Sequence, residues 1–490
     1  MSDIESKVPE RADRLKKLEE LRAMGVDPYP ITYPVDTRAA QILADPEKYI
    51  AEAKLHALAG RVVSYRSHGK SAFINILDDT GKIQAYVRKD IVGDPAYAAF
   101  KLYDIGDFVG IKGPVFKTHT GETTIEAREV ALLSKSLLPL PEKFHGLQDV
   151  DTRFRKRYLD LIANPGIKEL FVKRTKFFKA LRDFMDEQGF MEVETPVLER
   201  IPGGADAAPF VTRHNTLDID LYLRISLELH LKRLIIGGYE KVYEIGRVFR
   251  NEGMSPQHLQ EFTLMECYWA YVDYARLMDF IEEMYCRMLE AVFGTLEIKY
   301  QDTALNFKRP WPRHDYRQLL IDKAGIDLDQ FPTLETLLPK LREKGIEPDP
   351  KLGRGRLIDQ LYKRFVRPFL VQPCFLVDHP LDISPLAKRH PGRPDYVQRF
   401  QALFAGAEVG NGFSELNDPL DQRARFEEQA RLREKGDSEA QMYDAEFVEA
   451  MEHGMPPCGG FGLGIDRFFA IVSDSESVRD VVFFPTMRPE

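Results

Sequence analysis

The hydrophobic pattern changes near Leu58, and this change limits the possible folds more than any other feature of the sequence. Before it, leucines recur at helical spacing among charged residues, and glycine and prolines between residues 25 and 34 end that pattern. After it, apolar and polar residues alternate in short runs separated by turn signals. These runs are LAGRVVSYR, SAFINILDD, GKIQAYVR, DFVGIKGPVFKT and TTIEAREVALL. The sequence therefore predicts a helical segment followed by a small domain of β-strands.

Five short strands in about 80 residues are typical of a closed or nearly closed barrel of the OB type, which often binds oligonucleotides. A barrel with only a structural role would show the same pattern. We predict a helical N-terminal extension over residues 1–57, an OB-fold β-barrel over 58–138 and a proline-bearing linker over 139–150.

The rest of the chain, residues 151–490, has the mixed pattern of one large α+β domain. We expect a long helix at about 164–188 and a helical insertion at about 300–370. Strands are expected near 221–225, 241–250, 260–272, 371–377 and 405–417. The predicted fold is thus α+β and multidomain.

Composition argues against several classes of protein. The chain has 490 residues and a formal net charge of −9, and only residues 58–135 are net basic, with 11 basic and 9 acidic side chains. Charge alone therefore gives weak support for nucleic-acid binding. The four cysteines form no CxxC pair and no zinc-like cluster, which favours a reducing compartment. No apolar run approaches the roughly 20 residues that span a bilayer, so we expect a cytoplasmic protein with no membrane partner.

The segment VYEIGRVFRNEGMSPQHLQEFTLMECYWAY predicts a β-hairpin with a polar loop of about seven residues. Strand alternation places Arg250 and Glu252 on one face, and Phe262 and Glu266 share a face of the return strand. Such a surface can hold an extended, charged ligand. Cross-strand Arg/Glu pairing on a solvated sheet is the alternative.

Two further segments place polar groups beside glycines. In VGNGFSELND, Asn411, Phe413 and Glu415 alternate with glycines, which indicates either close approach of a ligand or a bulge. In GGFGLGIDRF, glycines precede a helix-like run with Arg467 near its start, which suits a phosphate but also suits a simple ion pair. Neither the P-loop nor the GxGxxG spacing is present.

Together these segments resemble the three signature motifs of class II aminoacyl-tRNA synthetases. The first is GFMEVETP at 189–196, the second is FRNE at 249–252 with the following loop and Phe262, and the third is GLGIDR at 462–467. RYLDLI, FRNEG, GNGFSELND and GFGLGIDR are specific to the lysyl-tRNA synthetase family of bacterial type, and the resemblance runs from about residue 11 to the C-terminus. It implies a homodimer whose interface includes GFMEVETP.

The resemblance implies ATP-dependent ligation of lysine to its tRNA through a lysyl-adenylate. Arg250 and Arg467 would be catalytic, and Mg²⁺ would bind Glu408. Glu408 has the opposite strand parity to Asn411, so we expect a bulge between them. The ATP-binding residues implied by the resemblance are Arg250, Glu252, His258, Phe262, Glu408 and Arg467.

Three glutamates would hold the lysine ammonium group, although Glu228 also suits a helix start and Glu266 and Glu415 also suit structural ion pairs. The full set of implied lysine-binding residues is Gly204, Glu228, Glu266, Tyr268, Asn411, Phe413 and Glu415. The implied anticodon-binding residues are Arg66, Phe73, Gln84 and Glu129, and plain barrel core is the alternative for Phe73.

The sequence departs from the family pattern at Gln401, where an acidic metal ligand is usual, at Tyr65, where an anticodon-contacting arginine is usual, and at Ala208, which replaces an arginine. The departure at Gln401 leaves the number of Mg²⁺ ions open. The rival interpretations are an aspartyl- or asparaginyl-type enzyme, which would need cations in the pocket, and a catalytically inactive tRNA-binding homologue.

Overall fold

The computed structural model describes residues 9–141, 147–347, 352–437 and 440–489. The chain forms two compact units, Met1–Gln148 and Asp149–Glu490, and each has its own hydrophobic core. The predicted linker spans this division, and its residues 142–146 lie outside the described residues. The same holds for 1–8 of the predicted extension and 348–351 of the predicted insertion.

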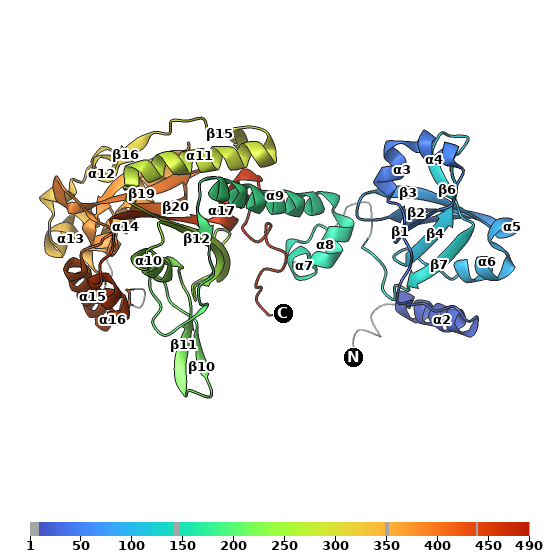
Figure 1. The fold of residues 1–490 in the computed structure, drawn as a ribbon, viewed down its shortest axis with the longest axis horizontal. Coiled ribbons are helices and arrows are strands. Elements are labelled where there is room, and N and C mark those ends of the chain that lie inside the picture. Colours follow the sequence, from blue (N-terminus) through green and yellow to red (C-terminus); the bar gives the residue numbers. More distant parts are fainter. Residues whose placement is uncertain (1–8, 142–146, 348–351, 438–439, 490) are drawn as a thin grey trace. The chain divides into compact units, whose positions relative to one another are not determined.

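The first unit is an OB-type β domain, as predicted, with seven strands in the order β5-β6-β3-β2-β1-β4-β7 (Figure 1). The strands are β1 (His56–His68), β2 (Ser71–Leu77), β3 (Lys82–Arg88), β4 (Phe108–Gly113), β5 (Val115–Lys117), β6 (Thr123–Glu126) and β7 (Glu129–Ser134). In the described part of this unit the edge strands β5 and β7 do not pair, so the sheet stays open. Its helices are α2 (Pro9–Ala23), α3 (Ala39–Ala44), α4 (Pro46–Glu52), α5 (Lys89–Val92) and α6 (Asp94–Phe100).

Seven strands replace the five that we expected because two runs are interrupted. Pro114, which has no N–H to donate, separates β4 from β5. At Ala127 and Arg128 the chain changes partners. The Ala127 N–H donates to Tyr86 of β3 and the Arg128 N–H donates to Lys112 of β4, which ends β6 and starts β7.

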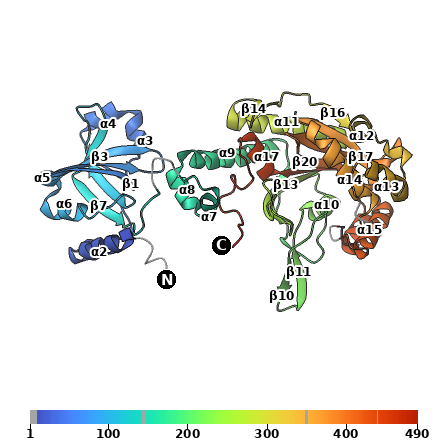
Figure 2. The same cartoon turned by 180° about the vertical axis from the view of Figure 1, so that it is seen from behind.

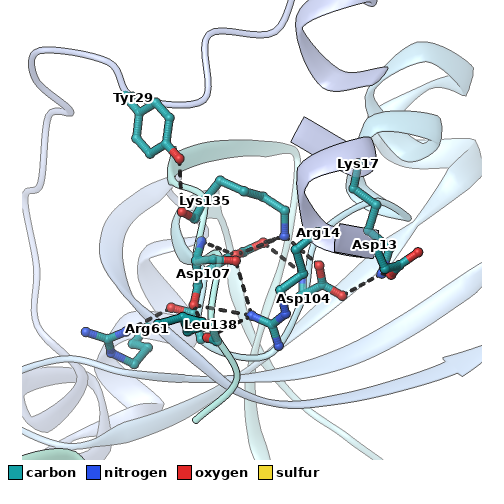
Figure 3. Close-up of polar contacts among 11 residues, drawn as sticks. Asp13, Arg14, Lys17, Tyr29, Arg61, Asp104, Asp107, Lys135 and Leu138 are labelled. Carbon is teal, nitrogen blue, oxygen red and sulfur yellow. Dashed lines mark hydrogen bonds and ion pairs between the residues drawn. The ribbon is translucent and has the colours of Figure 1, made fainter. Parts of the chain in front are cut away.

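Polar contacts around the buried Lys135 attach helix α2 to the rest of this unit (Figure 3). Lys135 is buried, and its ammonium group lies 2.6 Å from Asp104 and 2.9 Å from Asp107. From α2, Lys17 reaches Asp104 at 2.8 Å, and Arg14 donates to the carbonyl of Ser136 at 3.2 Å. Because buried charges are tolerated only when paired, these contacts fix the helix in one position.

The second unit is built on a large, mainly antiparallel sheet in the order β16-β17-β19-β20-β21-β13-β12-β8, with β18 paired to β19 (Figure 2). Its strands are β8 (Met191–Glu192), β12 (Lys241–Phe249), β13 (Glu261–Ala270), β16 (Arg313–Asp315), β17 (Cys374–Pro380), β18 (Arg389–His390), β19 (Arg393–Phe404), β20 (Ala407–Ser414) and β21 (Cys458–Gly464). Smaller sheets pair β9 (Leu198–Glu199), β10 (Val211–His214) and β11 (Ile219–Leu223), and β14 (Glu297–Tyr300) with β15 (Thr303–Asn306). The α+β fold class is confirmed.

Helices cover both faces of this sheet (Figure 1). One face packs against α9 (Pro165–Glu187), α11 (Tyr274–Phe293) and α17 (Ile465–Val472) in the main core. The other face packs against α10 (Glu228–Ile236), α15 (Pro419–Glu434) and α16 (Ala445–Glu452). The remaining helices are α7 (Val150–Arg155), α8 (Arg157–Ala163), α12 (Tyr316–Ala324), α13 (Leu334–Glu343) and α14 (Arg354–Phe365).

Three expectations need correction. The helices α12, α13 and α14 lie within the predicted insertion, but the insertion does not begin at 300, because β15 pairs with β14 and β16 pairs with β17 of the large sheet. Strand β19 was not predicted, since charged residues interrupt its apolar pattern. The GGFGLG segment forms the central strand β21 instead of a loop that enters a helix.

Candidate active site

A cavity of about 1300 Å³ opens on the sheet face that α10 covers. The residues predicted for ligand binding in this unit line the cavity. The acidic side chains of the lysine pocket and the basic side chains of the ATP site lie in different parts of it. The carboxylates of Glu228, Glu266 and Glu415 lie close enough to repel one another electrostatically. The positive charges of Arg250 and Arg467 instead surround His258. The cavity therefore has an anionic end and a cationic end.

The glycines of β21 create space for the anionic end. Phe461 and Leu463 point into the main core, so the alternating glycines 460 and 462 face the cavity. A Cβ atom at Gly460 would lie 2.1 Å from Glu415 Oε1 and 2.4 Å from the ring of Tyr268. The close approach of a side chain explains this glycine, which corrects our expectation of a phosphate-binding entry to a helix.

Glu266 of β13 is buried and well supported by donors. It accepts hydrogen bonds from Ser226 Oγ at 2.7 Å, from the backbone N–H of Leu227 at 3.0 Å and from the hydroxyl of Tyr268 at 3.0 Å. Burial, with the negative charge of Glu228, raises the pKa of Glu266 to about 7, although these hydrogen bonds oppose the rise. A bound cation would lower this pKa and ionise the carboxyl group.

Glu228 and Glu415 flank a lysine of the chain itself. Glu228 begins α10, and Lys232 follows one turn later, with its ammonium group paired to both carboxylates. Both alternatives that we left open are therefore present, since Glu228 starts a helix and Glu415 joins an ion pair. Sequence analysis missed Lys232, and the only signal for it was its i,i+4 spacing from Glu228.

Gly204, Asn411 and Phe413 complete this end of the cavity. Gly204 has φ +82°, and a Cβ atom there would lie 2.8 Å from the Cβ of Glu228, so only glycine fits. Asn411 Oδ1 accepts a hydrogen bond from Arg399 Nε at 2.8 Å, and sequence analysis also missed Arg399.

At the cationic end, Arg250 and Glu252 lie in the hairpin loop and not on the strands. Strand β12 ends at Phe249 and β13 begins at Glu261, so the loop is longer than we predicted. The Arg250 N–H donates to the carbonyl of Gln260 at 2.8 Å at the base of this loop. The Arg250 guanidinium lies 5.1 Å from the ring centroid of Phe262. A cation and an aromatic face thus meet at the cavity wall.

Arg467 and His258 lie beside this pair. Arg467 Nη1 donates to the carbonyl of Glu408 at 2.7 Å, and its Nη2 donates to the carbonyl of Gln257 at 3.4 Å. Loss of hydration and the positive charges of Arg467, Arg250 and neighbouring side chains lower the pKa of His258 to about 4. The field at this end therefore favours a polyanion.

Glu408 lies at the bulge that we predicted. Ala402 of β19 pairs with Gly410 and Leu403 pairs with Glu408, so Val409 is the extra residue in β20. Gln401 Nε2 donates to Glu408 Oε2 at 2.8 Å. One carboxylate with an amide beside it suits Mg²⁺, which keeps several waters and takes substrate phosphates as further ligands.

The GFMEVETP segment is held by a buried ion pair that the sequence did not reveal. Arg224 lies 2.6 Å from Glu244, and Glu244 accepts hydrogen bonds from the backbone and hydroxyl of Thr195. Ala208 lies beside the cationic end, since its carbonyl accepts from the N–H of Asn251 at 2.7 Å.

In the first unit, Phe73 lies on the outer face of its sheet. Its strand buries Ala72, Ile74 and Ile76 and leaves Phe73 partly exposed, stacked on Tyr86 with ring centroids 4.3 Å apart. This placement argues against plain barrel core. Arg66 is exposed and pairs with Phe73 across the strands, whereas the neighbouring Tyr65 packs on Phe100.

Gln84 and Glu129 are not brought together. Gln84 is buried, and its amide donates to Glu122 at 2.9 Å and accepts from Thr124 at 2.8 Å. Glu129 instead pairs with Lys112 at 3.2 Å, on the strand pair β4–β7. Glu122 is thus the carboxylate that contacts Gln84, and its place next to a predicted turn was the signal that we overlooked.

Two further properties concern the described residues. They contain no group of three or more His, Cys, Asp and Glu side chains placed to bind a metal ion. None of the helices within them has the length and apolar character that crossing a membrane requires.

Comparison with known proteins places this geometry in context. Residues 149–488 match the family model of class II tRNA synthetases (D, K and N), and residues 57–133 match that of the OB-fold nucleic acid binding domain. A lysine–tRNA ligase of Moorella thermoacetica is 50% identical over 479 residues, which cover 98% of each chain. That of Thermotoga maritima is 49% identical over 488 residues, covering 98% of this chain and 96% of the relative.

Proposed function

This chain belongs to the class II tRNA synthetases and is similar to lysine–tRNA ligases along nearly its whole length, and we propose that its cavity makes lysyl-adenylate from lysine and ATP. The chain is an aminoacyl-tRNA synthetase that attaches lysine to tRNA. The observation that carries the adenylate proposal is the two-ended cavity, because lysine presents ammonium groups and ATP presents a polyanion.

Lysine binds at the anionic end. Its side-chain ammonium group forms ion pairs with Glu266 and Glu415, and Tyr268 and Phe413 surround the methylene chain. Glu415 Oε1 is buried without a hydrogen-bond partner among the described residues, which supports a ligand donor at this position. Gly204, Glu228 and Asn411 surround the α-amino and α-carboxylate groups. An aspartate side chain would meet buried carboxylates here, which opposes the aspartyl-type alternative.

ATP binds at the cationic end. Phe262 and Arg467 enclose the adenine, Glu252 accepts from its amino group, and His258 and Arg467 contact the γ-phosphate. Arg250 contacts the α-phosphate. A carboxylate oxygen of lysine attacks the α-phosphorus, the bond from phosphorus to pyrophosphate breaks, and pyrophosphate leaves.

The terminal hydroxyl of the tRNA then takes the lysyl group and releases AMP. Arg250 stabilises the charge that develops on the α-phosphate, and the cavity holds both reactants in line. Mg²⁺, bound at Glu408 with Gln401 beside it, would supply charge neutralisation for the pyrophosphate.

The first unit reads the anticodon of the tRNA. Phe73 stacks on a base, Gln84 and Glu129 contact base edges, and Arg66 contacts phosphate. The Glu122 carboxylate orients the Gln84 amide. Partial exposure of the Phe73 side chain and exposure of Arg66 support this arrangement.

The enzyme works as a homodimer in the cytoplasm. Met191, Val197 and Leu198 are exposed apolar residues in and beside the GFMEVETP segment, which supports a partner that covers them. All four cysteines are free, which supports a reducing compartment.

Lysine-dependent exchange of pyrophosphate with ATP tests the proposal. We expect exchange with lysine and none with aspartate or asparagine. Glu266→Gln should raise KM for lysine by the equivalent of about 2–4 kcal/mol, because a buried charge pair is lost, and should leave KM for ATP within about twofold. An unchanged lysine KM would contradict the pocket assignment.

A further inference from the structure

Lys232 is a buried lysine in the wall of the proposed lysine pocket. Its side chain is almost fully inaccessible, and its ammonium group forms ion pairs with Glu228 on its own helix and with Glu415 after β20. The same group lies 5.3 Å from the ring centroid of Phe413 and 6.0 Å from that of Tyr268. Lysine is almost never fully buried without a partner, so this placement is specific.

The charges of the pocket can be counted from these contacts. Glu228, Glu266 and Glu415 are buried and supply three carboxylates. Lys232 supplies the cation that forms ion pairs with them. Arg399 keeps its charge, but it hydrogen-bonds to the neutral Asn411 at 2.8 Å and Ser384 Oγ at 3.0 Å and acts on Glu228 only through space. Counted by ion pairs, two of the three carboxylate charges remain for a ligand, and free lysine has two ammonium groups.

We propose that Lys232 is a specificity-determining residue that sets the charge of the pocket, so that its three carboxylates accept the two ammonium groups of one lysine molecule. This inference rests on the proposed function. Lys232 occupies the cation position between Glu228 and Glu415, which keeps both carboxylates ionised and in place. It acts on the substrate through them.

Several titratable and charged groups face Lys232 from the elements packed around it. They are Glu228 on α10, Glu266 and Tyr268 on β13, Arg399 on β19, Glu415 after β20, Cys458 on β21 and Lys388. Only the carboxylates among them change charge near neutral pH when a neighbouring cation is removed. Loss of Lys232 should therefore be visible in the pH dependence of lysine use.

The sign of this effect follows from the contacts. Without Lys232, three buried carboxylates repel one another, and the pKa values of Glu228 and Glu415 rise further because of burial. A protonated carboxyl group no longer attracts the substrate. Lysine use should then decline at a higher pH than it does in the parent.

Three variants test the inference by pyrophosphate exchange across a pH series. Lys232→Met keeps an unbranched side chain against Phe413 and Tyr268 but removes the charge. It should raise KM for lysine about tenfold or more at neutral pH, shift the acid limb of kcat/KM for lysine upward by about one unit, and leave KM for ATP within about twofold. Glu228→Gln should also raise KM for lysine.

The double variant Lys232→Met/Glu228→Gln gives the sharpest result. Glu228→Gln alone leaves two carboxylates and Lys232, whereas the double variant leaves two carboxylates and no internal cation, which restores the parent's net charge of the pocket. Its KM for lysine should be at least about threefold lower than that of Glu228→Gln, and its acid limb should return toward that of the parent. The same substitution would thus damage the parent and improve the Glu228 variant.

Other results would overturn the inference. An unmoved acid limb in Lys232→Met, or damage that simply adds in the double variant, would mean that Lys232 only fills space. If Lys232→Met does not fold, the comparison of the double variant with Glu228→Gln still decides, and a double variant that also fails to fold would assign Lys232 a structural role. Absence of lysine-dependent exchange in the parent would instead overturn the proposed function, and this inference with it.

Discussion

Substitution of Gly460 by alanine should damage lysine binding selectively. The added Cβ atom would lie 2.1 Å from Glu415 Oε1 and 2.4 Å from the ring of Tyr268. Carbon atoms in proteins pack at about 3.5–4.0 Å, so both side chains must move by more than about 1 Å. The backbone is not the problem, because Gly460 has no positive φ.

The geometry sets the approximate free-energy cost of the Gly460→Ala substitution. Forcing one extra methyl group into a well-packed site costs about 1–3 kcal/mol. Glu415 and Tyr268 are also two of the groups proposed to contact the lysine side chain, so part of this cost appears as weaker lysine binding. We expect KM for lysine in pyrophosphate exchange to rise about tenfold, which corresponds to about 1.4 kcal/mol, with KM for ATP nearly unchanged.

Gly462 provides a matched control on the same strand and the same face. A Cβ atom there would come no closer than 3.5 Å, to Glu266 Cγ, which is an ordinary contact. In thermal unfolding of the free enzyme, Gly462→Ala should therefore melt near the parent temperature, and Gly460→Ala should melt lower. Equal melting temperatures for the two variants, or a parental lysine KM in Gly460→Ala, would refute the reasoning.

Three further predictions concern the other functional groups. Arg250→Ala should lower the rate of pyrophosphate exchange by about 10²-fold or more while the protein stays folded, because stabilisation of charge on the α-phosphate is lost; near-normal exchange would exclude this role. ATP binding should raise the pKa of His258 from about 4, since phosphates offset the neighbouring positive charges, so calorimetry at about pH 5.5 in two buffers should detect proton uptake that His258→Gln lacks. Phe73→Ala should lose about 1–3 kcal/mol of base stacking and raise KM for tRNA while lysine-dependent exchange stays normal, and parallel loss of both activities would indicate a structural role.

Local patterns made much of the fold predictable. The alternation in β2 predicted a strand, the outward Phe73 was implied only by the resemblance, and the parity of Glu408 and Asn411 predicted the bulge in β20. The three motif segments were found because each is contiguous in sequence. Their convergence on one cavity came from the resemblance, since no local rule brings β13 beside β21.

The missed features depend on contacts between distant segments. Lys232 lies on an amphipathic helix, where a lysine is usually solvated, and only Glu415, far along the chain, explains its burial. Glu122 was missed because only its hydrogen bond with Gln84, on another strand, distinguishes it from an ordinary surface carboxylate. The Gly-rich strand was mistaken for a loop because glycine opposes strand formation, and the side chains that require it come from other strands.

The titratable groups at the two ends of the cavity change the stability of the fold in opposite directions over nearly the same pH range. Glu266 has its pKa raised from 4.5 to about 7, so the folded protein binds the extra proton and this group stabilises the fold less as pH rises through that interval. His258 has its pKa lowered from 6.5 to about 4, so the unfolded chain binds the extra proton and stability increases as pH rises through that interval. Each cost arises because loss of hydration and neighbouring like charges together disfavour the ionised form of the group. In the proposed function a lysine ammonium group would relieve the first and a triphosphate would relieve the second, so the electrostatic cost built into the free enzyme would be removed only when both substrates are in place.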